Sequence, residues 1–279
     1  MDGFVLFPMN QTIDLAPGDV YRGYVQVANS ADATSDFYYR TSVMPYGVTG
    51  EDYTIDLATM SSWTQIVDWV KIDEPTGKIA PNEVKKLWFT IEVPESVPAG
   101  GQYFAIGVSA DKERASSNGV SINDVYEMAS VVYADVAGET IRRGEVMSNA
   151  IPGFVASGKP VVSAMVNNSG NIHEKVEVTI EVKNALGGGI VFPLEGEENT
   201  FSELVMPETT KYLVRELDAV PALGVFEVTQ NITYLGETFY NTKTLIMCPI
   251  WFLVLLALLA MTFGATLAAI VKKHRKKKS

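Results

Sequence analysis

The chain has 279 residues and a formal net charge of −11, and one stretch of 28 residues, Thr244–Val271, contains no charged side chain. A helix of that length measures about 42 Å, which exceeds the hydrocarbon core of a bilayer at about 30 Å. This stretch excludes a simple soluble globular protein. The last eight residues supply six cations, so the rest of the chain carries −17. That sign argues against a nucleic-acid partner, because binding phosphates requires positive charge.

Residues 1–137 are predicted to form a first β-sandwich domain. Apolar and polar residues alternate along segments 21–27 and 87–93, a period of two that is typical of strands with one buried face. Turn-forming sequences separate the predicted strands at Ala16–Asp19 and Pro98–Gly101. Short strands with this punctuation favour an antiparallel sandwich.

The insertion 44–70 is the least strand-like part of this domain, and it holds four candidate binding residues: Tyr46, Tyr53, Trp63 and Trp69. Insertions on a rigid sandwich often carry binding residues, and aromatic rings suit sugar or peptide contacts. Residues 62–70 also fit a short helix capped by Ser61 or Ser62. In that alternative the two tryptophans and Ile66, spaced by three, form the buried face of the helix.

Residues 154–243 repeat the pattern of the first half and are predicted to form a second domain. Segment 25–32 resembles segment 164–171, and 80–89 resembles 206–214, in the same order along the chain. We therefore predict an all-β ectodomain of two tandem Ig-like β-sandwiches joined by a linker at 138–153. A single C-terminal transmembrane helix at 244–271 and a cytoplasmic basic tail at 272–279 complete the expected organisation.

The predicted span has the features of a membrane anchor. Trp251 lies near its start, where an indole suits the membrane interface. Ala260, Gly264 and Ala268 recur every four residues on one helix face, a spacing that permits helix packing. The cations that set the topology follow the span: Lys272, Lys273, Arg275, Lys276, Lys277 and Lys278.

The positive-inside rule places this basic tail in the cytoplasm and residues 1–243 outside the cell membrane. An outward-facing domain needs an export signal, yet Met1–Met9 has neither a basic region nor a long apolar one. We expect either that a signal peptide has been removed or that the recorded start lies downstream of the real one. Cys248 is the single cysteine, so no disulfide framework is expected, which fits a bacterial surface.

The sequence offers little chemistry for an enzyme. His173 is the one histidine before the basic tail, and the segment Ile172–Val176 lacks the second histidine of a zinc-protease motif. No nucleophile elbow, phosphate loop or dinucleotide fingerprint is present. The acid pairs Glu51/Asp52 and Asp73/Glu74 could serve in glycoside hydrolysis, but acid pairs are common on a surface this negative. We predict a noncatalytic protein with no metal and no cofactor.

Several segments together resemble the N-terminal domain of the WxL-interacting proteins of bacterial cell surfaces: Phe7–Gln11, Leu15–Gly18, Val25–Ala31, Lys71–Glu83 and Val93–Tyr103. The layout of two Ig-like domains, a membrane helix and a basic tail is similar too. The resemblance implies an anchored surface protein whose first domain associates with peptidoglycan and whose second binds WxL-type partner proteins. It carries no binding residue over to a numbered position of this chain.

Two functions remain as hypotheses. The first is a membrane-anchored surface protein whose extracellular domains bind cell-wall peptidoglycan, another surface protein, or both. The second is a membrane-tethered, chaperone-like assembly factor that binds surface subunits by strand addition. The second function requires a long, unpaired strand edge in one domain.

Overall fold

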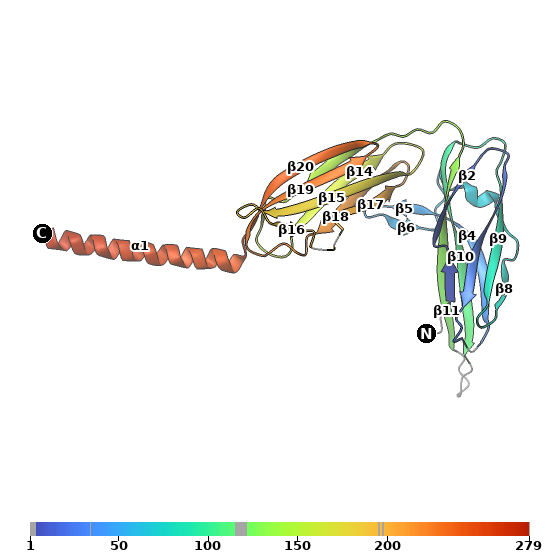
Figure 1. Cartoon of the computed structure of the whole chain (residues 1–279), viewed down its shortest axis with the longest axis horizontal. Helices are drawn as coiled ribbons and strands as arrows, with labels where there is room; N and C mark the ends of the chain where they lie inside the picture. Colours follow the sequence, from blue (N-terminus) through green and yellow to red (C-terminus); the bar gives the residue numbers. More distant parts are fainter. Residues whose placement is uncertain (1–3, 34, 115–121, 195, 197, 279) are drawn as a thin grey trace. The chain divides into compact units, whose positions relative to one another are not determined.

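The computed structural model describes residues 4–33, 35–114, 122–194, 196 and 198–278, and it describes no side chains for 111–114, 122–126 and 270–278. Most of these residues form β-strands, and the one long helix lies at the C-terminal end (Figure 1). This confirms the prediction of a β-rich chain with an apolar C-terminal helix. The chain divides into two compact units. Unit 1 consists of Met1–Gly144, Asn167–Glu174 and Leu204–Lys211; unit 2 consists of Glu145–Val166, Lys175–Glu203 and Tyr212–Ser279.

Unit 1 is built on two sheets. The four-stranded sheet has the order β1 (Phe4–Phe7), β3 (Val20–Asn29), β9 (Val84–Glu92) and β7 (Val70–Ile72). The five-stranded sheet has the order β2 (Asn10–Leu15), β11 (Ile122–Val136), β10 (Gly100–Arg114), β4 (Phe37–Pro45) and β8 (Thr76–Ile79).

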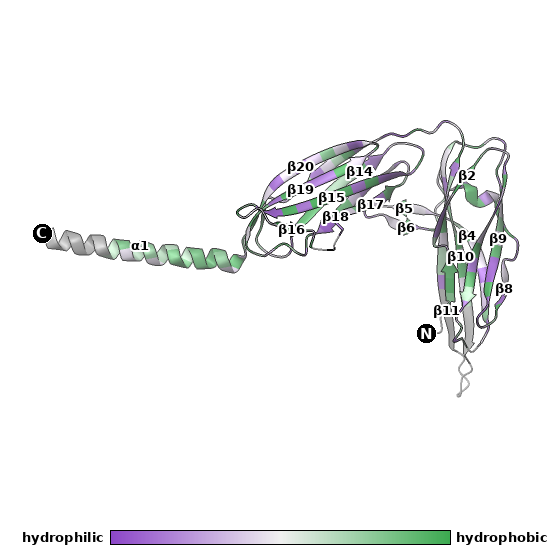
Figure 2. Ribbon diagram, in the orientation of Figure 1, coloured by the Kyte–Doolittle hydropathy of each residue, from purple (hydrophilic) through white to green (hydrophobic). Residues whose placement is uncertain are grey.

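Alternation along these strands builds the core of unit 1. Every second residue of β3 and β9 is buried, whereas β10 is buried almost continuously from Gly100 to Ala110. Buried residues of both sheets join one apolar cluster. Phe89 of one sheet and Phe104 of the other meet edge to face, with ring centroids 6.0 Å apart. Figure 2 shows the corresponding alternation of hydrophobic and hydrophilic residues along the strands. The two sheets therefore pack face to face as a β-sandwich.

The N-terminal segment contributes one strand to each sheet. β1 pairs antiparallel with β3, so that Phe4 lies opposite Asn29. β2 pairs parallel with β11, from Asn10 opposite Val131 to Leu15 opposite Val136. Pro8 lies between the two strands and has no N–H with which to continue a ladder. The chain therefore changes sheets at Pro8 and Met9, and β2 begins only at Asn10.

The insertion 44–70 forms a small hairpin and a short helix. The hairpin consists of β5 (Gly47–Thr49) and β6 (Thr54–Asp56). The helix η1 is a 3₁₀-helix, Gln65–Trp69, that starts after Thr64 without a side-chain cap. It is therefore shorter than the helix predicted over 62–70, and neither Ser61 nor Ser62 caps it. A 3₁₀-helix has three residues per turn and rarely runs longer than this.

The strands of unit 2 also form two sheets, and the ends of some of these strands belong to unit 1. The smaller has the order β12 (Gly144–Ala150), β14 (Val161–Asn168) and β18 (Thr209–Glu216). The larger has the order β13 (Phe154–Val155), β20 (Glu237–Met247), β19 (Gly224–Tyr234), β15 (Glu174–Asn184) and β16 (Ile190–Phe192), with β17 (Thr200–Val205) on β15.

Two predicted boundaries differ from the observed elements. Residues 144–150, assigned to a linker from the sequence, form the strand β12. This strand lacks a clean alternation of buried and exposed residues, which is why the sequence does not mark it. Residues 244–247, assigned to the membrane helix, belong to β20, where Leu245 and Met247 are buried. Their apolar side chains merge in the sequence with those of the helix.

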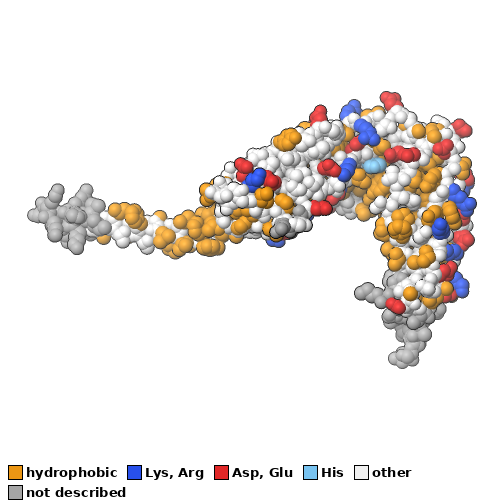
Figure 3. All heavy atoms as spheres, viewed as in Figure 1, with side chains coloured by type: hydrophobic (Ala, Val, Ile, Leu, Met, Phe, Trp, Pro, Cys, Tyr) orange, Lys and Arg blue, Asp and Glu red, His pale blue; other side chains and the backbone are white. Residues whose placement is uncertain are grey.

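The helix α1, Ile250–Lys278, follows β20 after Cys248 and Pro249. Its first twenty residues, Ile250–Ala269, have a mean hydropathy of 2.3, and none of this segment is buried in the protein. Hydrophobic side chains cover this part of the helix (Figure 3). The segment is therefore long and apolar enough to cross a membrane.

Replacing Phe89 by alanine should destabilise unit 1. Phe89 is fully buried between the sheets, and removal of its ring leaves a cavity, so the free energy of unfolding should fall by about 3 kcal/mol. The control is Val84→Ala on the same strand, because Val84 is 63% exposed and its loss should change stability by less than about 0.5 kcal/mol. Denaturant titration of the full chain in detergent measures both. Equal effects of the two substitutions would contradict the packing described here.

Candidate functional site

The long ladder between β10 and β11 organises the candidate site. The two strands pair antiparallel over their whole length, from Gly100 opposite Val136 to Arg114 opposite Ile122. One face of the ladder is buried in unit 1 through residues such as Phe104, Val108 and Val132. The residues between these point to the outer face of the five-stranded sheet.

β11 has a neighbour on its other side for only part of its length. β2 pairs with Val131–Val136 and reaches no further, so among the described residues no strand covers the outer side of Ile122–Ser130. We call these nine residues the free edge of β11. They are paired to β10 on one side, which holds the backbone extended and presents the other side for pairing.

The hydrogen bonds of β2 show which backbone groups face the free side. The N–H of Val131 donates to the carbonyl of Met9 at 2.9 Å, and the N–H of Ala137 donates to that of Leu15 at 2.8 Å. Backbone groups in an antiparallel ladder alternate in direction with a period of two. The N–H and C=O groups of Glu127 and Ala129 therefore face the open side, and those of Met128 face β10.

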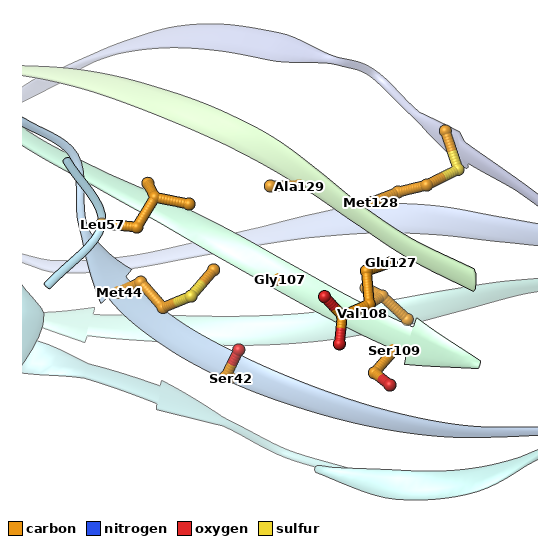
Figure 4. A pocket seen from close by; sticks show the side chains of 9 residues that line it. All are labelled: Ser42, Met44, Leu57, Gly107, Val108, Ser109, Glu127, Met128 and Ala129. Atoms are coloured by element: carbon orange, nitrogen blue, oxygen red, sulfur yellow. The ribbon is translucent and has the colours of Figure 1, made fainter. Parts of the chain in front are cut away.

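A hollow of about 270 Å³ lies on the outer face of the same sheet, beside the free edge. In Figure 4, Met44 and Leu57 lie at one end of the hollow, and Glu127 and Ser109 lie at the other. Its lining also includes Ser42, Gly107, Val108, Met128 and Ala129.

The hollow exists because Gly107, at its base, has no side chain. Gly107 of β10 lies between Ser42 of β4 and Ala129 of β11 in the pairing register. A Cβ atom on Gly107 would come within 2.6 Å of the Met44 methyl carbon and 2.7 Å of the Ser42 hydroxyl. Small residues on three adjacent strands thus leave a depression that extends to β11. Its lining combines apolar side chains with the carboxylate of Glu127.

Three of the four predicted binding residues lie in a second cluster of unit 1. Trp63 is buried and packs edge to face on Tyr103, with ring centroids 5.7 Å apart. The ring of Tyr46 lies 5.9 Å from that of Tyr133, and Tyr53 packs against the same cluster together with Met206.

The protein's own groups surround these rings. The Tyr53 hydroxyl accepts a hydrogen bond from the N–H of Met206 at 3.0 Å and also bonds the Thr209 hydroxyl. Lys211 lies 4.5 Å from the centroid of the Tyr53 ring. Burial raises the pKa of Tyr53 above its usual range, although both hydrogen bonds oppose this shift. A role for the rings in ligand binding stays a prediction.

Trp69 lies apart from the other three. It packs against the main core of unit 1, to which the fully buried Ile66 belongs. The sequence placed Trp63, Ile66 and Trp69 on one helix face in its alternative interpretation. The residues are partly or fully buried as that interpretation expects, but Trp63 contacts a different cluster because it precedes η1.

His173 connects the aromatic cluster to acidic residues. The Tyr103 hydroxyl accepts a hydrogen bond from the backbone N–H of His173 at 2.8 Å. The same hydroxyl lies 2.9 Å from Nδ1 of the His173 ring. Burial lowers the pKa of His173, and the nearby Asp135 opposes this effect. Burial also raises the pKa values of Asp135 and Glu174, while Arg142 lowers both.

This polar cluster has the geometry of a structural hydrogen-bond network. The Tyr103 hydroxyl can donate to Nδ1 of the neutral His173 ring while its oxygen accepts the backbone N–H of the same residue. Burial raises the pKa of Tyr103 well above its usual range, so the hydroxyl keeps that proton. Within the described part of the chain, Tyr103 hydrogen-bonds to His173, and the rings of Tyr103 and Tyr133 pack against its imidazole.

The remaining predicted residues lie at the surface. Asp73 and Glu74 form ion pairs with Arg22 and Lys85, each at 2.7 Å. Glu51 and Asp52 are exposed in the turn of the β5–β6 hairpin. Within the described part of the chain, no group of His, Cys, Asp and Glu side chains is placed to hold a metal ion.

The predicted helix residues all belong to α1. Trp251 is 63% exposed at its start. Ala260, Gly264 and Ala268 are exposed, so their role in packing stays a prediction. The side chains of the predicted topology determinants, Lys272, Lys273, Arg275, Lys276, Lys277 and Lys278, are outside the described set.

Sequence reasoning missed the free edge of β11 and the hollow beside it. The strand pattern of residues 122–136 is visible in the sequence, with apolar residues at Val132, Ala134 and Val136. The partner on its other side is β2, more than a hundred positions away, and its length decides how much of β11 is covered. A comparison of the two strand lengths was the available signal.

No family model and no curated protein matches the chain. Solved structures of bacterial fimbrial chaperones are similar at low identity. The Escherichia coli chaperone DraB is 11% identical with a TM-score of 0.41, covering 87% of this chain and 98% of its own. The Pseudomonas aeruginosa chaperone CupB2 is 9% identical with a TM-score of 0.36, covering 86% and 99%. A chain of the Salmonella enterica SafA pilin–SafB chaperone complex is 12% identical with a TM-score of 0.42, covering 88% and 97%.

Lowering the pH should reduce the stability of the folded protein, because protonation of His173 is less favourable in the folded state than in the unfolded chain. Its pKa is lower in the folded protein than the reference value of 6.5, so the unfolded chain binds the proton more readily. The stability that depends on neutral His173 is complete above pH 6.5 and is lost as the pH falls through its folded pKa. Melting curves of the full chain at pH 7.5 and pH 5.5 measure this loss, with both pH values chosen around that reference.

The control is His173→Phe, which cannot take up a proton. The difference between its two melting temperatures should be smaller than in the unmodified protein. Asp135 and Glu174 oppose the trend, because their raised pKa values favour the folded state as the pH falls. They are present in both proteins, so the comparison reports His173 together with its effect on the pKa of Asp135. An unchanged difference would contradict the assignment.

Proposed function

We propose that the protein is a noncatalytic, membrane-tethered surface protein that binds another surface protein by strand addition on the free edge of β11. A partner strand would pair with Ile122–Ser130 and extend the five-stranded sheet by one strand. α1 would hold the protein in the cell membrane, with both β units outside and the basic tail in the cytoplasm. The observation that carries the proposal is the nine-residue edge that β2 leaves uncovered.

Backbone geometry supports pairing at this edge. Glu127 and Ala129 present N–H and C=O groups on the open side, in line with the groups of Val131 that already bond to Met9. Each such hydrogen bond contributes about 1 kcal/mol once the competition with water is included. A strand that pairs along the whole edge gains several of them without any rearrangement of β10.

Other strand edges of the protein are less suited to this role. The outer strands β1, β7 and β8 of unit 1 are only three or four residues long. The edge strand β18 carries Lys211 and Arg215, and charged side chains on an edge discourage pairing. The sequence of the free edge contains two acidic residues, Asp124 and Glu127, and no proline or lysine.

The hollow supports the same location. Its rim includes Glu127 and Ala129, so a strand added to β11 brings its side chains next to the depression over Gly107. Backbone pairing would supply affinity, and the side chain that reaches the hollow would supply specificity. The resemblance to WxL-interacting proteins is consistent with a surface-protein partner, although it names no residue.

Two prolines should abolish strand addition. In the variant Glu127→Pro/Ala129→Pro, the two N–H donors on the open side are lost, while those directed at β10 remain. Proline is tolerated on an edge for this reason. Loss of two hydrogen bonds predicts at least about a tenfold fall in partner binding. Cross-linking on intact cells with a membrane-impermeant reagent, followed by purification of the full chain, measures the partner recovered.

The matched control is Glu127→Thr/Ala129→Thr, which changes the same side chains but keeps both N–H groups. It should recover the partner at close to the unmodified level. Equal recovery with the proline pair, at an unchanged melting temperature, would contradict strand addition. Retention of the proline variant on isolated peptidoglycan sacculi, at high salt, would favour the wall-binding function instead.

Removal of α1 should release the protein from membranes. A chain ending at Cys248 lacks the apolar segment Ile250–Ala269 and should move from the membrane fraction to the soluble fraction on sedimentation. As the control, a chain that ends at Val271 keeps the apolar segment and loses only the tail. It should stay with the membranes. Sedimentation of the chain that ends at Cys248 with membranes after a carbonate wash would contradict the tether.

A further inference from the structure

Three loops of unit 2 share one end of its larger sheet. β20 ends at Met247, which pairs with Gly224 at the start of β19. Phe226, two residues further on, pairs with Asn184 at the end of β15. β13 runs parallel to β20, with Val155 opposite Met247. The end of β20 therefore lies beside the β15–β16, β18–β19 and β13–β14 loops.

This is also the end from which α1 begins. The N–H of Cys248 donates to the carbonyl of Val155 at 3.0 Å, and the N–H of Ile250 donates to that of Ala156 at 3.2 Å. The first residue of the apolar helix is thus hydrogen-bonded to the β13–β14 loop. The β15–β16 loop lies two strands away, or about 10 Å at the usual spacing between strands.

All three loops lack charge over long runs, in a chain of which one residue in five is charged. No Asp, Glu, Lys or Arg occurs in Ile151–Gly158, Ala185–Leu194 or Ala219–Phe226. Charged residues flank the runs, and two of them, Lys159 and Asp218, form an ion pair with each other. At the other end of the same sheet, the short turn between β19 and β20 is followed at once by Glu237.

Large apolar side chains of these loops are exposed. Leu186 is 85% exposed in the β15–β16 loop, where Gly187–Gly189 follow it, and Ile190 is 59% exposed. Phe154 is 53% exposed and Leu223 is 45% exposed. Figure 3 shows hydrophobic side chains both on α1 and on the end of unit 2 next to it. In water this arrangement leaves apolar surface without a partner.

We propose that these loops form a lipid-contacting surface that inserts into the membrane interface around the start of α1. The proposal rests on the tether in the proposed function, because the span brings this end of unit 2 to the bilayer. Exposed apolar side chains partition into the boundary between headgroups and acyl chains. Trp251 lies at the same level, where an indole is favoured.

The experiment measures how deeply a fluorescent label on one cysteine lies in the lipid bilayer. The full chain carries Cys248→Ser and one new cysteine, labelled with an environment-sensitive dye and reconstituted in phosphatidylcholine vesicles. The test position is Gly187→Cys, since no atom lies within 4 Å of a Cβ placed there and Leu186 stays intact. The control position is Glu237→Cys, at the other end of the sheet. Lipids brominated on the upper acyl chain quench dyes that lie in the interface.

Quenching and a blue shift at residue 187, with neither at residue 237, are the expected result. Adding Leu186→Asp should then lower the inserted population about tenfold, which corresponds to about 1.4 kcal/mol, because a carboxylate resists transfer into lipid. Vesicles that carry the protein but quench neither label would overturn the lipid contact and leave the tether standing. Equal quenching of both labels would overturn it too. Failure of the protein to float with vesicles would refute the tether and the contact together.

Discussion

The length of β2 is the constraint on which the open edge depends. β2 cannot begin before Asn10, because the same segment must first supply β1 to the opposite sheet and cross over at Pro8. β11, in contrast, is as long as β10, with which it forms an unbroken ladder of fifteen pairs. A strand of six residues therefore covers one end of a strand of fifteen. The uncovered remainder is a direct consequence of dividing one N-terminal segment between two sheets.

The hollow has its origin in the same sheet but in a different property, side-chain size. Ser42, Gly107 and Ala129 are neighbours across three strands, so three small residues meet on the outer face. Larger side chains, Met44 and Leu57 among them, stand around them. Gly107 is needed here for space, since a Cβ atom would collide with the neighbouring side chains. Edge and hollow adjoin on one sheet, and the proposed strand addition depends on this arrangement.

Much of the fold could be predicted from the sequence because its signals are local. Alternation with a period of two marks β3, β9 and β15, and the uncharged run of 28 residues marks the helix. Features that depend on distant partners could not be predicted. The coverage of β11 is set by the register with β2, and β12 is recognised only through its pairing in a sheet. Trp63 and Trp69 belong to different clusters because η1 begins after Trp63, a boundary that the aromatic spacing does not reveal.

The candidate site also combines features that are visible in local sequence with features that depend on distant parts of the chain. The gathering of Tyr46, Tyr53 and Trp63 could be expected from their shared insertion, but their neighbours Met206 and Thr209 come from elsewhere in the chain. The three uncharged runs of unit 2 can be found in the sequence alone. That they lie at one end of a sheet, beside the start of α1, follows only from the pairing of β13, β15, β19 and β20.

An open strand edge is normally a risk, because two copies of a protein can pair through it and aggregate. Two properties of this chain reduce that risk. The net charge of −17 before the basic tail makes copies repel one another, and Glu127 places a carboxylate on the edge itself. In the proposed function, a partner held in the same membrane would meet the edge at a high effective concentration, so modest affinity per strand would be sufficient. Weak pairing between copies is therefore compatible with the proposed strand addition.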